Sequence, residues 1–377
     1  MKFNRQSYLN TRRDAWVEIN LDAIEKNILE LKKYARKGSK ILAVVKADAY
    51  GHGSVMITPT LLASGVDMLG VASVDEAMQL RESGINVPML VLGAAPIWAY
   101  DWAAYNDISL SLFLPQHIEA CRITYEKTGI KPKVHIKLDT GMNRIGVSHE
   151  HAVDLIKRVQ NSDFIHLEGI FTHFACAENL EKTKEQLSIW NDVLSKVNTD
   201  GLLLHIANTA ALISFPDINY NMARAGIGIY GLQPDVVPTC KNLPNLIPAM
   251  SLRGRIVNIH NAHSNSGVSY SHRYITDKET VIATVPIGYA DGVSRGLSGK
   301  IYGLLHGKKV PQIGNITMDQ MMFDITDVNA DEGDIITLLG KDGDEEISVN
   351  QWADILNTIN YELICRLKVR LSRVYTR

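Results

Sequence analysis

The sequence has few cysteines, no excess of charge of either sign and no long hydrophobic run. Its 377 residues contain four widely spaced cysteines, which form no C-x-x-C pair: Cys121, Cys176, Cys240 and Cys365. In a chain of this length, that spacing argues against a disulfide framework and indicates reduced, mostly buried thiols. The 39 basic residues nearly balance the 41 acidic ones, for a net charge of −2. Proteins that bind nucleic acid usually carry a basic excess, so we expect no nucleic-acid partner.

The apolar segments are too short for a membrane span. The longest uncharged stretch, residues 87–100, is interrupted by Pro88, Gly93 and Pro96, whereas a span needs about 20 apolar residues. The N-terminus carries basic residues without the apolar segment of a signal peptide. We therefore expect a cytoplasmic protein with no membrane partner, whose function is chemistry on a small molecule.

The residues that are present predict a folded protein with a repeating βα pattern. The composition is 46% hydrophobic and 21% charged, which is ordinary for globular domains. From residue 16 to residue 231, short apolar runs alternate with amphipathic stretches such as residues 74–84. We predict eight strands, which end at Val45, Ala72, Leu92, Phe113, Leu138, Phe171, Ala207 and Arg224. Apolar strands separated by helices are typical of a parallel sheet buried on both faces.

Eight such units fit a closed (β/α)8 TIM-like barrel, although a doubly wound open sheet alternates in the same way. After about residue 248 the segments become short, β-rich and rich in glycine, asparagine and aspartate, which indicates antiparallel strands. Only residues 349–356 predict a helix there, with Ser348 as its cap.

The α/β fold class therefore comes with two predicted domains. The N-terminal barrel is expected over residues 15–247, and a mainly antiparallel β domain over residues 248–377. Residues 1–14 are a candidate segment to pack on the β domain.

Polar side chains occur at the ends of five predicted strands. They are Lys46, Lys137 with Arg144, His173, His205 with Asn208 and Thr209, and Arg224. The carboxyl ends of barrel strands meet at one rim, where active sites of such barrels lie. We therefore expect these side chains to form one site.

Lys46 is the most informative of these residues because it directly follows a run of five aliphatic residues. A dry neighbourhood favours the neutral amine, which is nucleophilic and suits a Schiff base with an aldehyde cofactor. The alternative is a surface lysine at the start of a loop.

Residues 226–231, GIGIYG, match the pattern G-x-G-x-x-G. A dinucleotide site is disfavoured because no βαβ unit or acidic residue follows at the required distance. The run fits better as a phosphate cradle after the last barrel strand. His149, His151, His260 and His263 lack the spacing of metal ligands, so we expect no metal.

Nine short motifs extend over nearly the whole chain: VVKADAYGHG, KLDTGMNRIG, THFA, HIANTA, ARAGIGIYG, GVSYS, PIGYADG, ITMDQ and TINYE. They occur in the order and spacing of the same motifs in alanine racemases. The chain therefore resembles the alanine racemase family. The resemblance implies a barrel that binds pyridoxal 5'-phosphate, a C-terminal β domain, and a homodimer whose active sites use both subunits.

The resemblance also implies two catalytic bases. Lys46 would form the Schiff base with the cofactor and serve as base for the D-enantiomer, and Tyr270 of the partner subunit would serve the L-enantiomer. Racemisation removes a proton from one face of a planar carbanion and returns it on the other, so it needs two opposed groups. Arg144 and Met318 would contact the substrate, and Tyr289 would narrow its entrance.

Cofactor contacts are implied in the same way. Arg224 would face the pyridine nitrogen with His205 supporting it, and His173 would stack beside the ring. The remaining contacts, most of them to the phosphate, would come from Tyr50, Asn208, Thr209, Gly226, Ile227 and Tyr361. Lys137 matches a lysine that is often carbamylated in this family.

The implied activity is interconversion of L- and D-alanine through an external aldimine, which supplies D-alanine for peptidoglycan. A serine or broad-specificity racemase is an alternative, although tyrosine rather than asparagine at position 361 favours alanine. A barrel-type pyridoxal-phosphate decarboxylase would need a catalytic cysteine in the β domain, and neither Cys240 nor Cys365 lies in that context. A non-catalytic pyridoxal-phosphate carrier would lack the β domain.

Overall fold

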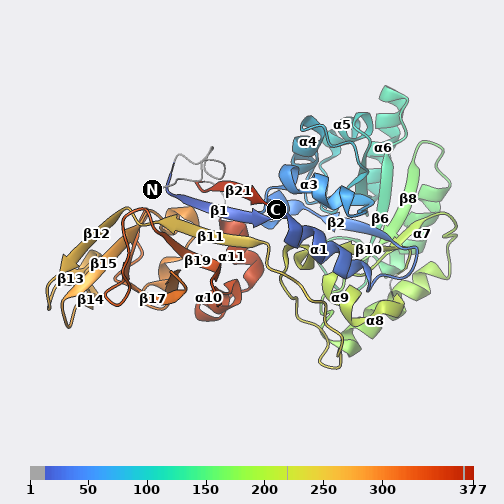
Figure 1. Ribbon diagram of the computed structural model, residues 1–377. Coiled ribbons are helices and arrows are strands. Elements are labelled where there is room, and N and C mark those ends of the chain that lie inside the picture. Colours follow the sequence, from blue (N-terminus) through green and yellow to red (C-terminus); the bar gives the residue numbers. More distant parts are fainter. Residues whose placement is uncertain (1–12, 219, 368–369) are drawn as a thin grey trace. The chain divides into compact units, whose positions relative to one another are not determined.

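The computed structural model describes residues 13–218, 220–367 and 370–377. The chain forms two compact units: Ala23–Ala49 with Gly53–Ile247, and residues 13–22 with Tyr50–His52 and Pro248–Arg377. Figure 1 shows the strands and helices of each. Within the described ranges, no helix combines the length and apolar character needed to cross a membrane.

The first unit is a nearly closed barrel of eight parallel strands, hydrogen-bonded in the order β10-β2-β3-β4-β5-β6-β8-β9. The strands are β2 (Lys40–Val44), β3 (Met68–Val71), β4 (Met89–Val91), β5 (Ile108–Leu112), β6 (Lys133–Asp139), β8 (His166–Phe171), β9 (Leu203–His205) and β10 (Met222–Ala225). The amide of Arg224 donates to the carbonyl of Ala207 at 3.1 Å, which links the two ends of this order. The predicted barrel is confirmed, and each predicted strand matches an observed one to within about two residues at its end.

Helices follow the strands in the barrel unit (Figure 1). They are α1 (Leu21–Lys32), α2 (Lys46–Tyr50), α3 (Ser54–Ala63), α4 (Val74–Glu82), α5 (Tyr100–Tyr105), α6 (Pro115–Thr128), α7 (His149–Gln160), α8 (Leu180–Leu194) and α9 (Thr209–Ser214). In α7 the buried residues are Ala152, Leu155, Ile156 and Val159, the spacing of a single apolar face. The side chain of Ser73 caps α4 by accepting from the Glu76 amide, as residues of this type commonly do.

The second unit contains a largely antiparallel sheet with the order β12-β15-β18-β17-β16-β19-β11-β1-β21. Its strands are β1 (Ala15–Asn20), β11 (Met250–Arg255), β12 (Asn258–Ala262), β15 (Thr280–Val285), β16 (Tyr302–Leu305), β17 (Lys308–Ile313), β18 (Met321–Asp324), β19 (Ile335–Asp342), β20 (Glu345–Ile347) and β21 (Ser372–Thr376). A separate hairpin pairs β13 (Gly267–Val268) with β14 (Tyr274–Ile275). The antiparallel character predicted after residue 248 is confirmed.

The N-terminal strand belongs to this second sheet, although the sequence analysis placed residues 15–22 in the barrel. β1 pairs antiparallel with β11 and parallel with β21. The apolar pattern of a buried strand is the same in either unit. The sequence does not show which sheet the strand joins, because its pairing partner lies more than 200 residues away. Arg13 Nη2 donates to Asp291 Oδ2 at 3.0 Å within this unit, whereas residues 1–12 of the predicted packing segment lie outside the described residues.

Two helices complete the second unit. The predicted helix is confirmed as α10 (Val349–Leu356), and the Ser348 side chain accepts from the Asn350 amide at 3.2 Å. The sequence analysis missed α11 (Asn360–Arg366), because seven residues are too few for a clear periodic pattern.

The chain makes a left-handed turn immediately after Lys46. Ala47, Asp48 and Ala49 all have φ of 54°, a conformation that costs roughly 1–2 kcal/mol for each non-glycine residue. Backbone strain of this kind persists only where surrounding contacts impose it, and it clusters at functional sites.

Two carboxylates hold this turn in place. Glu76 Oε1 accepts from the Ala47 amide at 2.7 Å, and its other oxygen accepts from the Ala72 amide at 2.7 Å. Asp48 Oδ1 accepts from the Ser54 amide at 2.7 Å. The conformation of the segment that follows Lys46 is therefore set by side chains of α2 and α4.

We expect Ala47→Gly to leave the apparent Tm unchanged or raise it, because glycine adopts a positive φ without strain. As a control, Ala120→Gly in the right-handed α6 should lower the apparent Tm by roughly 2 °C, the effect of about 1 kcal/mol in a chain of this size. Differential scanning fluorimetry of both variants measures the difference. Equal losses would contradict the assignment of strain to the turn.

Candidate active site

Arg224, on β10, is buried in the barrel unit, with 3% of its surface exposed. Its Nη1 donates to His205 Nδ1 at 3.0 Å and to the His205 carbonyl at 2.9 Å. Its Nη2 lies 2.7 Å from the Thr172 carbonyl, 3.0 Å from His173 Nδ1 and 3.1 Å from the Ile206 carbonyl. No acceptor within the described residues takes the N–H on Nε. Arginine only donates, so this one donor is available to a ligand.

Burial, together with the charge of Arg224, keeps the two neighbouring histidines neutral. Burial, followed by the Arg224 charge, lowers the pKa values of both His173 and His205 well below the usual histidine range. Because Arg224 donates to Nδ1 of each ring, each neutral ring carries its proton on Nε2. Burial alone lowers the pKa of Arg224 to about 9, and an arginine at that value remains protonated at neutral pH.

Lys137, on β6, is also buried, with 5% of its surface exposed. Burial, with Arg224 and Arg144 as further causes, lowers its pKa to about 7, so about half of its amines are neutral near pH 7. The Phe171 ring lies 5.1 Å from Lys137 Nζ and 5.6 Å from Arg224 Cζ, which places both cationic groups over one aromatic side chain.

Lys46 is half-buried and begins α2 directly after β2. Its charge and that of the exposed Arg144 contribute to the lowered pKa values of both Lys137 and His173. The structure thus brings together the basic residues that the sequence analysis placed at the carboxyl ends of β2, β6, β8 and β10.

The glycine-rich segment forms a short 3-10 helix, η3 (Ile227–Tyr230), directly after β10. Thr209 Oγ1 accepts from the Gly226 amide at 2.8 Å, while the buried amides of Ile227 and Gly228 donate to no acceptor within the described residues. A Cβ on Gly228 would lie 2.8 Å from Thr209 Cγ2, so only glycine permits this close approach. Buried, unpaired amides beside a hydroxyl are suited to an anion.

Asn208 has a structural role that the sequence analysis did not foresee. Its side chain caps α9, and Oδ1 accepts from the Ala211 amide at 2.9 Å. The cap fixes the start of α9, where Thr209 is the first helical residue.

The remaining predicted site residues lie in the second unit. Tyr50 and Tyr361 face each other, with ring centroids 6.1 Å apart and planes inclined by 52°. Tyr289 and Met318 belong to adjoining segments, because the Tyr289 amide donates to the Thr317 carbonyl at 2.9 Å and the Ala290 amide to the Met318 carbonyl at 3.0 Å.

Tyr270 is 72% exposed, the largest exposure of any tyrosine among the exposed hydrophobic residues described. Its flanking residues Ser269, Ser271 and His272 all have positive φ values, of 64°, 60° and 44°. Asn315 holds this strained segment: its Nδ2 donates to the Tyr270 carbonyl at 2.7 Å, and its carbonyl accepts from Ser269 Oγ at 2.9 Å. The Tyr270 phenol is thus solvent-exposed on a segment whose backbone conformation is imposed by its contacts, a feature that clusters at functional sites.

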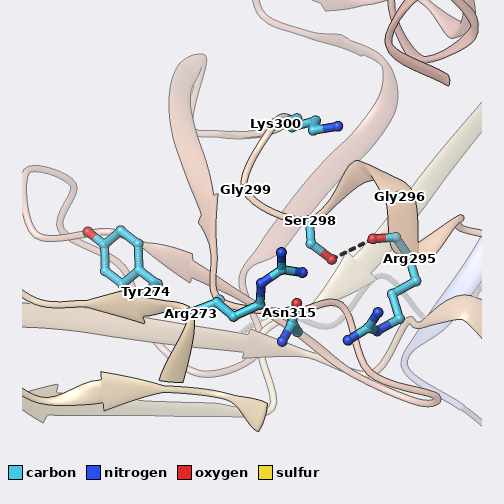
Figure 2. A pocket seen from close by; sticks show the side chains of 9 residues that line it. Arg273, Tyr274, Arg295, Gly296, Ser298, Gly299, Lys300 and Asn315 are labelled. Carbon is cyan, nitrogen blue, oxygen red and sulfur yellow. Dashed lines mark hydrogen bonds between the residues drawn. The ribbon is translucent and has the colours of Figure 1, made fainter. Parts of the chain in front are cut away.

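A pocket of about 510 Å³ adjoins this segment. Its charged lining residues are the cations Arg273, Arg295 and Lys300, and no acidic residue is among the described residues that line it. Figure 2 shows Arg273 and Arg295 on either side of Asn315 in this view, and the bond from Ser298 Oγ to the Arg295 carbonyl. The sequence analysis missed this pocket because three separate segments form it.

Sequence reasoning also missed Glu76, His135 and Glu168. Glu76 lies inside a helix, and His135 and Glu168 lie inside strands. The sequence around a polar residue in such an element does not show which distant residue it contacts in the fold.

Comparisons with known proteins identify the family of this chain. A family model for the alanine racemase N-terminal domain matches residues 19–234, and one for the C-terminal domain matches residues 249–375. An alanine racemase of Methanococcus maripaludis is 40% identical over 96% of this chain and 98% of its own.

Two solved structures are similar throughout. The alanine racemase of Bacillus anthracis with bound L-Ala-P is 37% identical, with a TM-score of 0.89 over 97% of this chain and 96% of its own. A histidine racemase of Leuconostoc mesenteroides is 30% identical, with a TM-score of 0.90 over 98% of this chain and all (100%) of its own. The chain belongs to the alanine racemase family and is a racemase, an isomerase.

Proposed function

We propose that this protein interconverts L- and D-alanine with pyridoxal 5'-phosphate as its cofactor. The observation that carries the proposal is the buried Arg224, which has one uncommitted N–H and lies among neutral histidines at the same rim as Lys46. The family membership and the alanine racemases among its relatives support the substrate.

The chemistry of the described residues fits this cofactor. Arg224 Nε can donate to a pyridine nitrogen, and Lys46 supplies the amine that binds an aldehyde. The amides of Ile227 and Gly228 with the Thr209 hydroxyl offer donors to a phosphate. His173 would lie beside the ring, and Tyr50, Tyr361, Asn208 and Gly226 complete the proposed set.

The bound cofactor would supply an electron sink for the carbon that loses its proton. Arg224 would set the strength of that sink, because a guanidinium donates a hydrogen bond without giving up its proton. The ring nitrogen would then stay neutral, which limits charge accumulation on the ring and the side reactions that follow from it.

Two residues would move the substrate proton. Lys46 would serve as base for the D-enantiomer, and its position is fixed by the clamped turn that follows it. Tyr270 would serve as base for the L-enantiomer in the site of a second copy of the chain, so the working form would be a homodimer with shared sites. The exposure of Tyr270 on a strained, anchored segment supports that assignment.

Arg144 and the Met318 backbone would bind the substrate carboxylate, and Tyr289 would narrow the entrance. The Tyr50–Tyr361 contact fills space with rigid rings, which favours a small substrate side chain. A histidine racemase is among the similar structures, so activity on amino acids larger than alanine should be measured. A cytoplasmic location and supply of D-alanine to peptidoglycan follow from the proposed activity.

We expect the purified protein, loaded with pyridoxal phosphate, to racemise L-alanine faster than L-serine or L-histidine in parallel assays. Because Tyr361 and Tyr50 restrict space, the ratio of kcat/KM for alanine over the larger substrates should exceed roughly tenfold. Circular dichroism of the product mixtures measures all three rates. A preference for histidine, or release of CO2, would reject the proposed substrate or reaction.

The lysine variant Lys46→Arg should lose both the visible absorbance of bound cofactor and nearly all turnover, because guanidinium is not a nucleophile at neutral pH. Lys40→Arg, at the start of β2, is the matched control and should retain both. Retained absorbance in Lys46→Arg would remove Lys46 from its proposed role.

The two proposed bases predict an asymmetry. Tyr270→Phe should suppress exchange of solvent deuterium into L-alanine by roughly a hundredfold or more, and into D-alanine much less. Tyr302→Phe, another exposed tyrosine of the second unit, is the control. Mass spectrometry of each enantiomer after partial reaction measures the exchange, and equal suppression would leave the assignment without support.

We further propose that Lys137 is carbamylated. Its neutral amine would attack CO2, forming a C–N bond and releasing one proton, and the resulting anion would lie near Arg224 and Arg144. At constant dissolved CO2, the carbamate fraction should rise as pH increases through about 7, because only the neutral amine reacts.

Labelling with ¹³CO2 should give a carbamate carbonyl resonance that follows this pH dependence. The resonance should be absent in Lys137→Met. A resonance that persists in that variant, or that weakens as pH rises at constant CO2, would contradict the prediction.

A further inference from the structure

A chain of buried polar side chains extends from Arg224 through the barrel interior. His205 Nε2 lies 2.9 Å from His135 Nδ1. His135 Nε2 in turn lies 3.6 Å from Glu168 Oε2, and Ser109 Oγ donates to the same oxygen. These residues belong to four different strands: β9, β6, β8 and β5. We refer to His205, His135 and Glu168 as the interior chain.

The direction of the hydrogen bonds in the interior chain is fixed by its first member. Arg224 only donates, so His205 Nδ1 accepts and His205 Nε2 carries the proton. His205 therefore donates to His135 Nδ1. His135 Nε2 lies 3.6 Å from Glu168 Oε2 and makes no hydrogen bond within the described residues. The chain thus has a cation, Arg224, at one end and a carboxylate, Glu168, at the other.

Such a chain is costly to build inside a barrel. TIM-barrel interiors are normally filled by branched aliphatic side chains, whereas His135 and His205 are both 0% exposed. His135 accepts from His205, so removing His135 leaves the buried Nε2–H of His205 without its acceptor. Apolar side chains at these positions would stabilise the barrel equally well. The presence of buried polar side chains therefore indicates a function.

Charged groups face the chain at its far end. Lys133 Nζ lies 3.8 Å from Glu168 Oε1 and 2.6 Å from Asp107 Oδ1. Burial raises the pKa of Glu168, but the nearby His135 ring and the hydrogen bond from Ser109 outweigh it and lower the pKa to about 2. Glu168 thus stays an anion at neutral pH and polarises the chain toward His205 Nδ1.

We propose that His135 and Glu168 are positioning residues for the racemisation reaction. Through His205 they strengthen the acceptor that anchors Arg224 Nη1, and so hold the free Nε–H of Arg224 in a fixed direction. This inference rests on the proposed function, in which that N–H meets the cofactor. Neither residue touches the substrate or the reacting atoms.

The first test compares two variants of similar size at position 135. His135→Leu removes the acceptor for His205 Nε2–H, and kcat should fall roughly tenfold, with KM changed less than about twofold. His135→Asn places an oxygen near the former Nδ1 position and should recover kcat to within roughly threefold. A role confined to packing predicts the reverse order, because leucine packs at least as well as asparagine.

The second test removes the negative charge of Glu168 and keeps the shape of its side chain. Glu168→Gln should lower kcat roughly threefold to tenfold, while Lys133→Met, its control at the end of the chain, should lower it less than twofold. In the cofactor-free protein, ¹⁵N NMR should show the His205 Nδ1 resonance shifted in His135→Leu and Glu168→Gln and unshifted in Lys133→Met.

An unshifted His205 resonance, or kcat within twofold of the parent in both His135→Leu and Glu168→Gln, would overturn the inference. If His135→Leu does not fold, Glu168→Gln against Lys133→Met decides the question. Absence of racemisation in the unsubstituted protein would reject the proposed function instead, and the NMR comparison, which needs no cofactor, would still test the chain.

Discussion

The buried charge of Arg224 is the constraint on which the barrel interior depends. Within the described residues no carboxylate pairs with this guanidinium, and its partners are backbone carbonyls and two imidazole nitrogens. Burying an unpaired cation is expensive unless hydrogen bonds satisfy it. The ends of β8, β9 and β10 supply these hydrogen bonds together. Burial, followed by the charge of Arg224, lowers the pKa values of His173 and His205 and brings that of Lys137 to about 7.

The two segments that carry the proposed bases share a strained backbone that side-chain hydrogen bonds hold in place. Lys46 precedes three residues at φ 54°, held by Glu76 and Asp48. Tyr270 lies among residues of positive φ, held by Asn315. In both cases a side chain from another element accepts from or donates to the strained backbone. Preorganisation of this kind fixes a reactive group before substrate arrives, so less order must be imposed during the reaction.

The sequence predicted the barrel because its strands are apolar runs with turn residues between them, a local signal that needs no partner. The polar residues at strand ends were predictable for the same reason, since the rim follows from topology. Residues 15–22 were placed in the barrel domain because the pairing of β1 with β11 is not encoded in six residues. The roles of Glu76, His135 and Glu168 were hidden because they depend on partners from other strands or loops, which only the fold brings within hydrogen-bond distance.

The interior chain also restricts how such a racemase can change its substrate. Arg224 donates to His205 and His205 donates to His135, so substitution of one of these three residues leaves a buried neighbour without its partner. Changes there must occur together or not at all. The exposed side chains of Tyr289 and Met318 lie outside this chain of hydrogen bonds. A different substrate side chain can therefore be accommodated by changes at those residues while the barrel interior stays the same.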